Sequence, residues 1–277
     1  MKYAEDNFSG NKGVSLFYQY WLPDMQPEAI LLIVHGLAEH SGRYMNIVNH
    51  FVPKGLAVYG FDQPGHGNSG GSRGYIERFS YFIRNLDIFL DIVRTRHPAT
   101  KVFIIGHSMG GTIASAYAVD HQNKIDGLIV SGTTLLTGSS VSPLQIALAR
   151  ILSLLLPKIG ISVLDASAIS RDEAVVSNYV NDPLVYRGKI HARSGAEFIN
   201  TTRILQHQIQ EINLPVFIMH GTADRLSDPR SSELLYDKIS SSDKTLKLYQ
   251  GFYHEIFNEP EREQVLADME SWLIAHI

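Results

Sequence analysis

Ser108 lies in a pentapeptide whose residue types and spacing are those of a nucleophilic serine. The pattern Gly106-His107-Ser108-Met109-Gly110 places a glycine two positions before and two positions after the serine. These glycines permit a tight backbone turn and keep neighbouring side chains away from the hydroxyl. Such a turn presents the hydroxyl at the end of a buried strand. The pattern alone also fits an ordinary turn serine, so the residues around it must distinguish a nucleophile from a structural serine.

A nucleophilic serine needs a general base, and the base needs a carboxylate that orients it. When the serine lies on a strand–turn–helix of this kind, the acid and then the histidine follow it along the chain. Asp224 comes shortly after the apolar run 216–219, and His254 follows the candidate strand 246–249. We expect His254 to act first as general base and then as general acid, with Asp224 holding its tautomer. Asp228 is the alternative acid, although it lies farther from the strand end.

The backbone amides of Leu37 and Met109 are the predicted oxyanion hole. A tetrahedral intermediate needs preorganised donors, each worth about 3 kcal/mol of the barrier. Met109 directly follows the serine, and Leu37 lies in a loop after another apolar run, where Gly36 lets the backbone turn. The chain has 12 histidines in all. Those beside these loops, His35, His66 and His107, are expected to shape the backbone.

The elements that must position these residues alternate between strands and helices. The run 14–21 alternates like a strand, and five continuous apolar runs are typical of parallel strands buried on both faces. These runs cover residues 29–34, 56–61, 102–105, 128–130 and 216–219, with a further candidate strand at 246–249. Helical spacing of apolar residues predicts helices over 79–96, 229–239 and 261–274. The alternation predicts a mostly parallel central sheet with helices on both faces.

The alternation breaks between residues 137 and 212. This part is rich in Leu, Ile and Ser, with helix-like pieces and no clear strand. We interpret it as a helical cap, or lid, inserted over the carboxyl ends of the strands. The predicted core then consists of residues 1–136 and 213–277, and the predicted cap of residues 137–212.

Composition excludes several other classes of protein. The net charge of −4 gives no basic footprint, so we expect no nucleic-acid partner. The absence of cysteine removes disulfides and zinc thiolate sites, and no His, Asp or Glu spacing predicts a metal site. We expect no cofactor. The Gly/Pro loop 62–69 lacks the residues of a phosphate-binding loop and is interpreted as a structural turn. Because the first residues lack the apolar stretch of a signal peptide, we expect a cytoplasmic protein.

Several motifs together resemble the α/β-hydrolases of the monoacylglycerol lipase and lysophospholipase group. The likeness runs from about Trp21 to the C-terminus. It rests on residues 35–44 (HGLAEHSGRY), 62–69 (DQPGHGNS), 106–111 (GHSMGG), 181–185 (NDPLV), 220–226 (HGTADRL) and 253–254 (YH), and on the cap segment 164–171. The cap segment makes monoacylglycerol lipases the nearest type.

The resemblance implies an α/β-hydrolase fold, the Ser108, Asp224 and His254 triad, and the Leu37 and Met109 oxyanion hole. It also implies a hydrophobic acyl tunnel under the cap, with Glu39 and Arg43 helping to order the alcohol end of the site. Leu37 stands where mammalian relatives have alanine, which implies a narrower pocket beside that amide.

The apolar stretch 144–156 within the predicted cap is broad for a helix packed on one side. We expect Leu152 and Leu155 to wall the acyl site and to touch a membrane or micelle surface transiently. An ordinary buried helix is the alternative.

Together these observations predict a serine hydrolase that cleaves monoacylglycerols through an acyl-enzyme on Ser108. A lysophospholipase and a short-chain carboxylesterase are the alternatives within this chemistry, and a prolyl aminopeptidase is more distant. Outside it, a catalytically silent ligand receptor on the same fold would require a damaged triad. The oligomeric state is not predicted.

Overall fold

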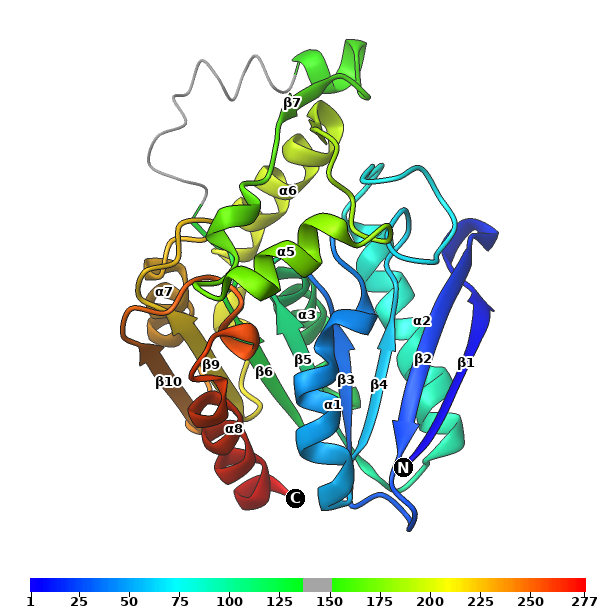
Figure 1. The fold of residues 1–277 in the computed structure, drawn as a ribbon, viewed down its shortest axis with the longest axis vertical. Coiled ribbons are helices and arrows are strands. Elements are labelled where there is room, and N and C mark those ends of the chain that lie inside the picture. The colour runs from blue at the N-terminus through cyan, green and yellow to red at the C-terminus, as the bar shows by residue number, and fades with distance from the viewer. Residues whose placement is uncertain (137–150) are drawn as a thin grey trace.

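The apolar runs form one eight-stranded sheet in the computed structural model, which describes residues 1–136 and 151–277. Its spatial order is β1-β2-β4-β3-β5-β6-β9-β10 (Figure 1). The strands are β1 (Lys2–Ser9), β2 (Ser15–Leu22), β3 (Ala29–Val34), β4 (Ala57–Phe61), β5 (Lys101–His107), β6 (Gly127–Ser131), β9 (Val216–Gly221) and β10 (Lys244–Tyr249). Strand β2 is antiparallel to both β1 and β4, and all other neighbours are parallel. The prediction of a mostly parallel sheet is therefore confirmed.

Each predicted strand lies within two residues of an observed one. Strand β1 was not predicted from the sequence. It is an edge strand in which only Phe8 is buried, so its sequence lacks the apolar alternation that would reveal it.

Helices cover both faces of the sheet. The α-helices of the core are α1 (Met45–Phe51), α2 (Ser80–Arg96), α3 (Met109–His121), α7 (Arg230–Lys238) and α8 (Arg262–His276). Alternate residues of β3 pack into two separate cores, because successive side chains of a strand point to opposite faces. Leu32 packs with side chains of α2 and α3, and Leu31 packs with side chains of α1 and α8.

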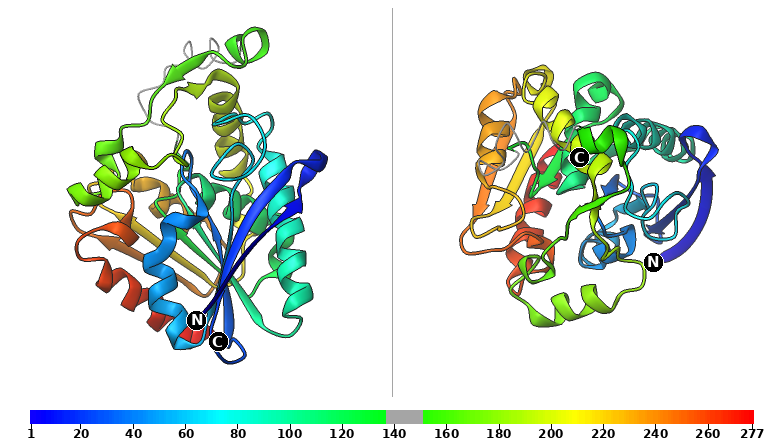
Figure 2. Two further views of the ribbon diagram at one scale, coloured as in Figure 1. Left: turned by 45° about the vertical axis from the view of Figure 1, so that its right-hand side comes forward. Right: turned by 90° about the horizontal axis from the view of Figure 1, so that it is seen from above.

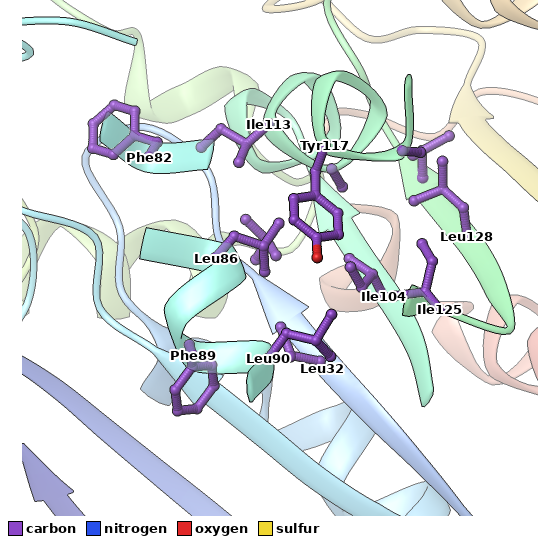
Figure 3. Packing of buried hydrophobic residues seen from close by; sticks show 14 of the residues in the cluster. Leu32, Phe82, Leu86, Phe89, Leu90, Ile104, Ile113, Tyr117, Ile125 and Leu128 are labelled. Atoms are coloured by element: carbon purple, nitrogen blue, oxygen red, sulfur yellow. The ribbon is translucent and has the colours of Figure 1, made fainter. Parts of the chain in front are cut away.

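The core on the α2 and α3 side is built from large apolar side chains at helical spacing. Phe82, Leu86, Phe89 and Leu90 of α2 lie opposite Tyr117 of α3 above the sheet (Figure 3). All of them are buried. The predicted helices 79–96, 229–239 and 261–274 therefore exist, each with ends within two residues of the prediction.

The segment between β6 and β9, described from residue 151 to residue 212, is called the inserted segment. It lies above the sheet and projects from it (Figures 1 and 2). It contains a helical piece at 151–155, then β7 (Gly160–Ser162), α5 (Glu173–Asn181), β8 (Ile190–His191) and α6 (Ala192–Leu205). The prediction that this part has no strand is wrong. β7 and β8 form a small antiparallel pair too short to show alternation.

No helix in the described ranges is long and apolar enough to cross a membrane.

Candidate active site

Ser108 occupies the sharp turn between β5 and α3. Its backbone has φ 54° and ψ −121°, a strained conformation for a residue with a side chain. The turn requires the glycine at position 110, because a Cβ there would lie 1.9 Å from the Val34 carbonyl oxygen. The Ser108 amide donates to the Ser131 carbonyl at 2.8 Å, which ties the turn to β6. The local sequence thus folds into the strand–turn–helix that a serine nucleophile needs.

His254 and Asp224 are brought together by the ends of β10 and β9. The His254 Nδ1–H donates to Asp224 Oδ2 at 2.6 Å. Both side chains are buried, with His254 only 5% exposed. Asp228, the alternative acid, instead forms an ion pair with the exposed Arg230. The structure therefore selects Asp224 as the partner of His254.

Asp224 has further partners that the sequence did not reveal. Its Oδ1 accepts the amides of Leu226 at 2.7 Å and Ser227 at 2.9 Å. Its Oδ2 lies 3.0 Å from Nε2 of His220, whose Nδ1 lies 2.7 Å from the Ser232 hydroxyl. The sequence motif 220–226 begins with His220, but only the fold shows that this histidine contacts the Asp224 carboxylate.

The charges of this pair reinforce one another. Burial alone would raise the pKa of Asp224, but the nearby His254 and the hydrogen bonds of both histidines hold that pKa well below its ordinary value. Burial alone would lower the pKa of His254, but the Asp224 carboxylate outweighs it and the pKa is raised. The arrangement favours an imidazole that readily accepts a proton.

The loop after β3 is held by His35. Its Nδ1–H donates to the Gly36 carbonyl at 2.7 Å, and its Nε2 accepts the Gln63 amide at 2.8 Å. Burial lowers the pKa of His35 to about 3, so the ring stays neutral. His35 shapes the backbone, as the sequence predicted. Leu37 in this loop and Met109 both line a cavity with Ser108.

This cavity has a volume of about 380 Å³ and is mostly apolar. Ser108 and His254 both line it. Its apolar wall comes largely from the inserted segment, through Val163, Leu164, Ile190, Phe198 and Ile199, with Ile76 and Leu226 from the core. The arrangement places a serine and an imidazole beside a space that fits a hydrocarbon chain.

Leu152 and Leu155 are not among the residues that line this cavity. Leu155 is 74% exposed, and Leu152 is half-buried. The wall expected from them is supplied instead by the segment around β7 and by α6. The residues 144–150 of the predicted apolar stretch lie outside the described residues.

Glu39 and Arg43 lie near Ser108 and His254. Glu39 lines a small second cavity together with Ser108 and His254. Its carboxylate and the Arg43 guanidinium are 3.0 Å apart, and Arg43 also contacts Glu255. Their role at the alcohol end of a substrate stays a prediction. In the described ranges no group of three or more His, Asp or Glu side chains could hold a metal ion.

Comparison with known proteins places this geometry among hydrolases. Residues 25–261 match the family model Hydrolase_4, described as "Serine aminopeptidase, S33". The chain is 38% identical over 274 residues to the monoacylglycerol lipase of Mycolicibacterium smegmatis, covering 99% of this chain and 98% of that protein. It is 33% identical over 264 residues to the monoglyceride lipase of Homo sapiens, covering 94% and 87%. The crystal structure of the Paleococcus ferrophilus monoacylglycerol lipase superposes with a TM-score of 0.85 at 32% identity, covering 95% of this chain and 99% of that one.

Proposed function

The chain belongs to the serine aminopeptidase S33 family of α/β-hydrolases, and from this premise we propose that it hydrolyses monoacylglycerols to glycerol and free fatty acid. It is a carboxylic ester hydrolase. The observation that carries the substrate assignment is an apolar cavity of about 380 Å³ lined by Ser108 and His254 together with apolar side chains. A single acyl chain fills such a space, whereas a peptide amine would find, among the described residues that line it, the carboxylate of Asp165 alone.

The chemistry uses the triad in two steps. In the first, the Ser108 Oγ attacks the ester carbonyl while His254 Nε2 takes the hydroxyl proton. The oxyanion is held by the amides of Leu37 and Met109, and collapse breaks the ester C–O bond as His254 protonates the departing glycerol. In the second, His254 takes a proton from water, the hydroxide attacks the acyl-enzyme, and the fatty acid leaves as Ser108 regains its proton.

Two of these roles draw support from particular contacts. The Asp224 bond to His254 Nδ1 leaves Nε2 as the nitrogen that can accept a proton from serine. Leu37 and Met109 share the cavity with Ser108, which suits their amides to a common oxyanion site.

The test compares turnover of a monoacylglycerol, a lysophospholipid and a short nitrophenyl ester by the purified protein. We expect the highest kcat/KM for the monoacylglycerol. A preference for the lysophospholipid or the short ester would assign one of the alternatives within the same chemistry. A prolyl peptide substrate tests the aminopeptidase alternative.

A fluorophosphonate probe separates an enzyme from a silent receptor on this fold. The wild-type protein should be labelled, and Ser108→Ala should not. A chain that remains unlabelled while correctly folded would contradict the proposed chemistry altogether.

We further propose that the inserted segment acts as a cap that docks transiently on a lipid surface. Large apolar side chains between residues 151 and 163 are exposed there: Ile151, Leu154, Leu155, Leu156, Ile159, Ile161 and Val163. Val163 is 58% exposed and also lines the cavity, so the apolar surface is continuous with the acyl site. A membrane or micelle is the occupant that both covers such a surface and supplies the substrate. A cytoplasmic location with peripheral membrane contact stays a prediction.

A further inference from the structure

One guanidinium joins two loops of the site. Arg43 lies in the short turn Ser41–Tyr44, which follows the loop that carries Leu37. Its Nη1 and Nη2 donate to the two oxygens of Glu255 at 2.6 and 2.8 Å, and its Nη1 also donates to Glu39 Oε2 at 3.0 Å. All three side chains are at most 10% exposed. This is a forked, desolvated contact that only an arginine can make.

Glu39 carries this contact to the oxyanion loop. Its Oε1 accepts the Gly36 amide at 2.6 Å and the Tyr44 hydroxyl at 2.7 Å. Gly36 directly precedes Leu37, whose amide is the proposed oxyanion donor. Glu39 therefore fixes the peptide plane next to the one that carries the Leu37 amide, which restricts the direction of that amide.

Glu255 carries the contact to the catalytic histidine. It directly follows His254 in the chain, and its Oε2 also accepts Nδ2 of Asn258 at 2.8 Å. Its backbone amide donates to the carbonyl of Ile169 in the inserted segment at 2.7 Å. The position of the His254 backbone is thus bound to a carboxylate whose main partner is Arg43.

The inserted segment also contacts the Arg43 guanidinium. The Arg43 guanidinium lies over the ring of Tyr179 in α5, 4.7 Å from its centroid. In addition, the Tyr186 amide donates to the Ala38 carbonyl of the oxyanion loop at 2.8 Å. The two loops and the inserted segment therefore converge on one buried cation.

We propose that Arg43 is a positioning residue that, through Glu39 and Glu255, holds the oxyanion loop and the His254 loop in register for attack by Ser108. The inference rests on the proposed hydrolase chemistry but on no particular ester. Buried ion pairs contribute little net stability, because desolvation offsets their attraction. A function in geometry accounts for a guanidinium held between two buried carboxylates at this place.

The same carboxylates act on the charge of His254. The ionisable groups around its ring are Asp224, Glu255, Glu39 and His107, with Arg43 beyond the glutamates. The His107 ring lies 4.7 Å from that of His254, and burial lowers the pKa of His107 to about 3, so it is neutral. Burial would raise the pKa of Glu255, but Arg43 brings it down to about 2. Glu255 is therefore an anion that favours protonated His254.

The experiment measures kcat, KM and the pH profile of Arg43→Lys and Glu255→Gln with a soluble nitrophenyl ester. Arg43→Lys keeps the positive charge but loses the bidentate contact with Glu255. Glu255→Gln keeps the shape of the side chain but loses its negative charge. We expect kcat to fall by about 10- to 100-fold in each variant with KM within about twofold, because small displacements of catalytic groups cost that much. In Glu255→Gln the acid limb of the pH profile of kcat should also move to lower pH, because the anion that favours protonated His254 is gone. The double variant should be no slower than the slower single variant, because both remove one contact.

Glu270→Gln is the matched control, since Glu270 of α8 pairs with Lys54, away from the site. It should leave kcat and the pH profile unchanged. Thermal unfolding checks that each variant is folded, and the rate of fluorophosphonate labelling measures the nucleophile without turnover. If wild type is labelled but the Arg43 and Glu255 variants keep wild-type kcat and pH profile, the positioning role is wrong. If wild type is not labelled, the proposed hydrolase function itself fails.

Discussion

Two regions line the same cavity but differ in the contacts that fix their side chains. One is the rim, meaning the loops at the carboxyl ends of the sheet strands that carry Ser108, Asp224 and His254. The other is the inserted segment. At the rim, Asp224 accepts four hydrogen bonds and His254 is 5% exposed. In the inserted segment, Leu154 and Leu155 are each 74% exposed, and Ile169 belongs to a small apolar cluster separate from the main core. The contrast indicates that many polar contacts fix the side chains of Asp224 and His254, whereas large apolar side chains of the inserted segment are left exposed.

The largest expected effect tests the rim. Asp224→Asn should lower kcat by about 10³- to 10⁴-fold, because the amide cannot hold the correct tautomer of His254 or stabilise its charge. Asp228→Asn is the matched control, since Asp228 pairs with exposed Arg230 and should stay within about twofold of wild type. Turnover of a soluble nitrophenyl ester measures both. Similar losses in the two variants would show that the acid has been misassigned.

The pH dependence of activity tests whether the Asp224 carboxylate raises the pKa of His254. His254 must be neutral to accept the serine proton, and its pKa is raised above the ordinary 6.5. The fraction of active enzyme therefore begins to fall at a higher pH than for an ordinary histidine, and kcat/KM should drop about tenfold per pH unit below the midpoint. The midpoint is obtained by measuring kcat/KM of the soluble ester from about pH 5 to about pH 9, a range that covers the titration of a histidine. A midpoint below 6.5 would contradict the role of the Asp224 carboxylate.

The smallest expected effect tests the inserted segment. Leu155→Glu should weaken binding to phosphatidylcholine vesicles by about tenfold, because an apolar side chain no longer enters the lipid surface. Hydrolysis of the soluble ester should not change, since Leu155 does not line the cavity.

Ile274→Glu provides the control for the inserted segment. Ile274 on α8 is 70% exposed, close to the 74% of Leu155, but belongs to another part of the molecule. It should leave vesicle binding intact. Equal effects of the two substitutions, or none from Leu155→Glu, would remove the proposed docking surface.

Local sequence patterns predicted most of the sheet, and they singled out Ser108, Asp224 and His254, of which the structure joins the last two by a hydrogen bond. Buried parallel strands are continuous apolar runs, so β3, β5 and β9 were recognisable without any tertiary information. Strand β1 and the pair β7 and β8 were missed because they are exposed or very short. Of the two leucines expected to wall the acyl site, neither lines the cavity, because apolar character does not tell which side of a helix meets a cavity.

By itself, the sequence determined that a serine turn exists and that an acid and a histidine follow it at strand ends. The apolar runs are local features, because each acts on the chain within a few residues, whereas the need for glycine at position 110 comes from the distant Val34 carbonyl. Only the tertiary structure decided that Asp224 rather than Asp228 meets His254, that His220 supports it, and that Arg43 binds Glu255. Arg43 and Glu255 are 212 positions apart, and pairing between charges so distant depends on how the strands order in the sheet, which no local pattern encodes.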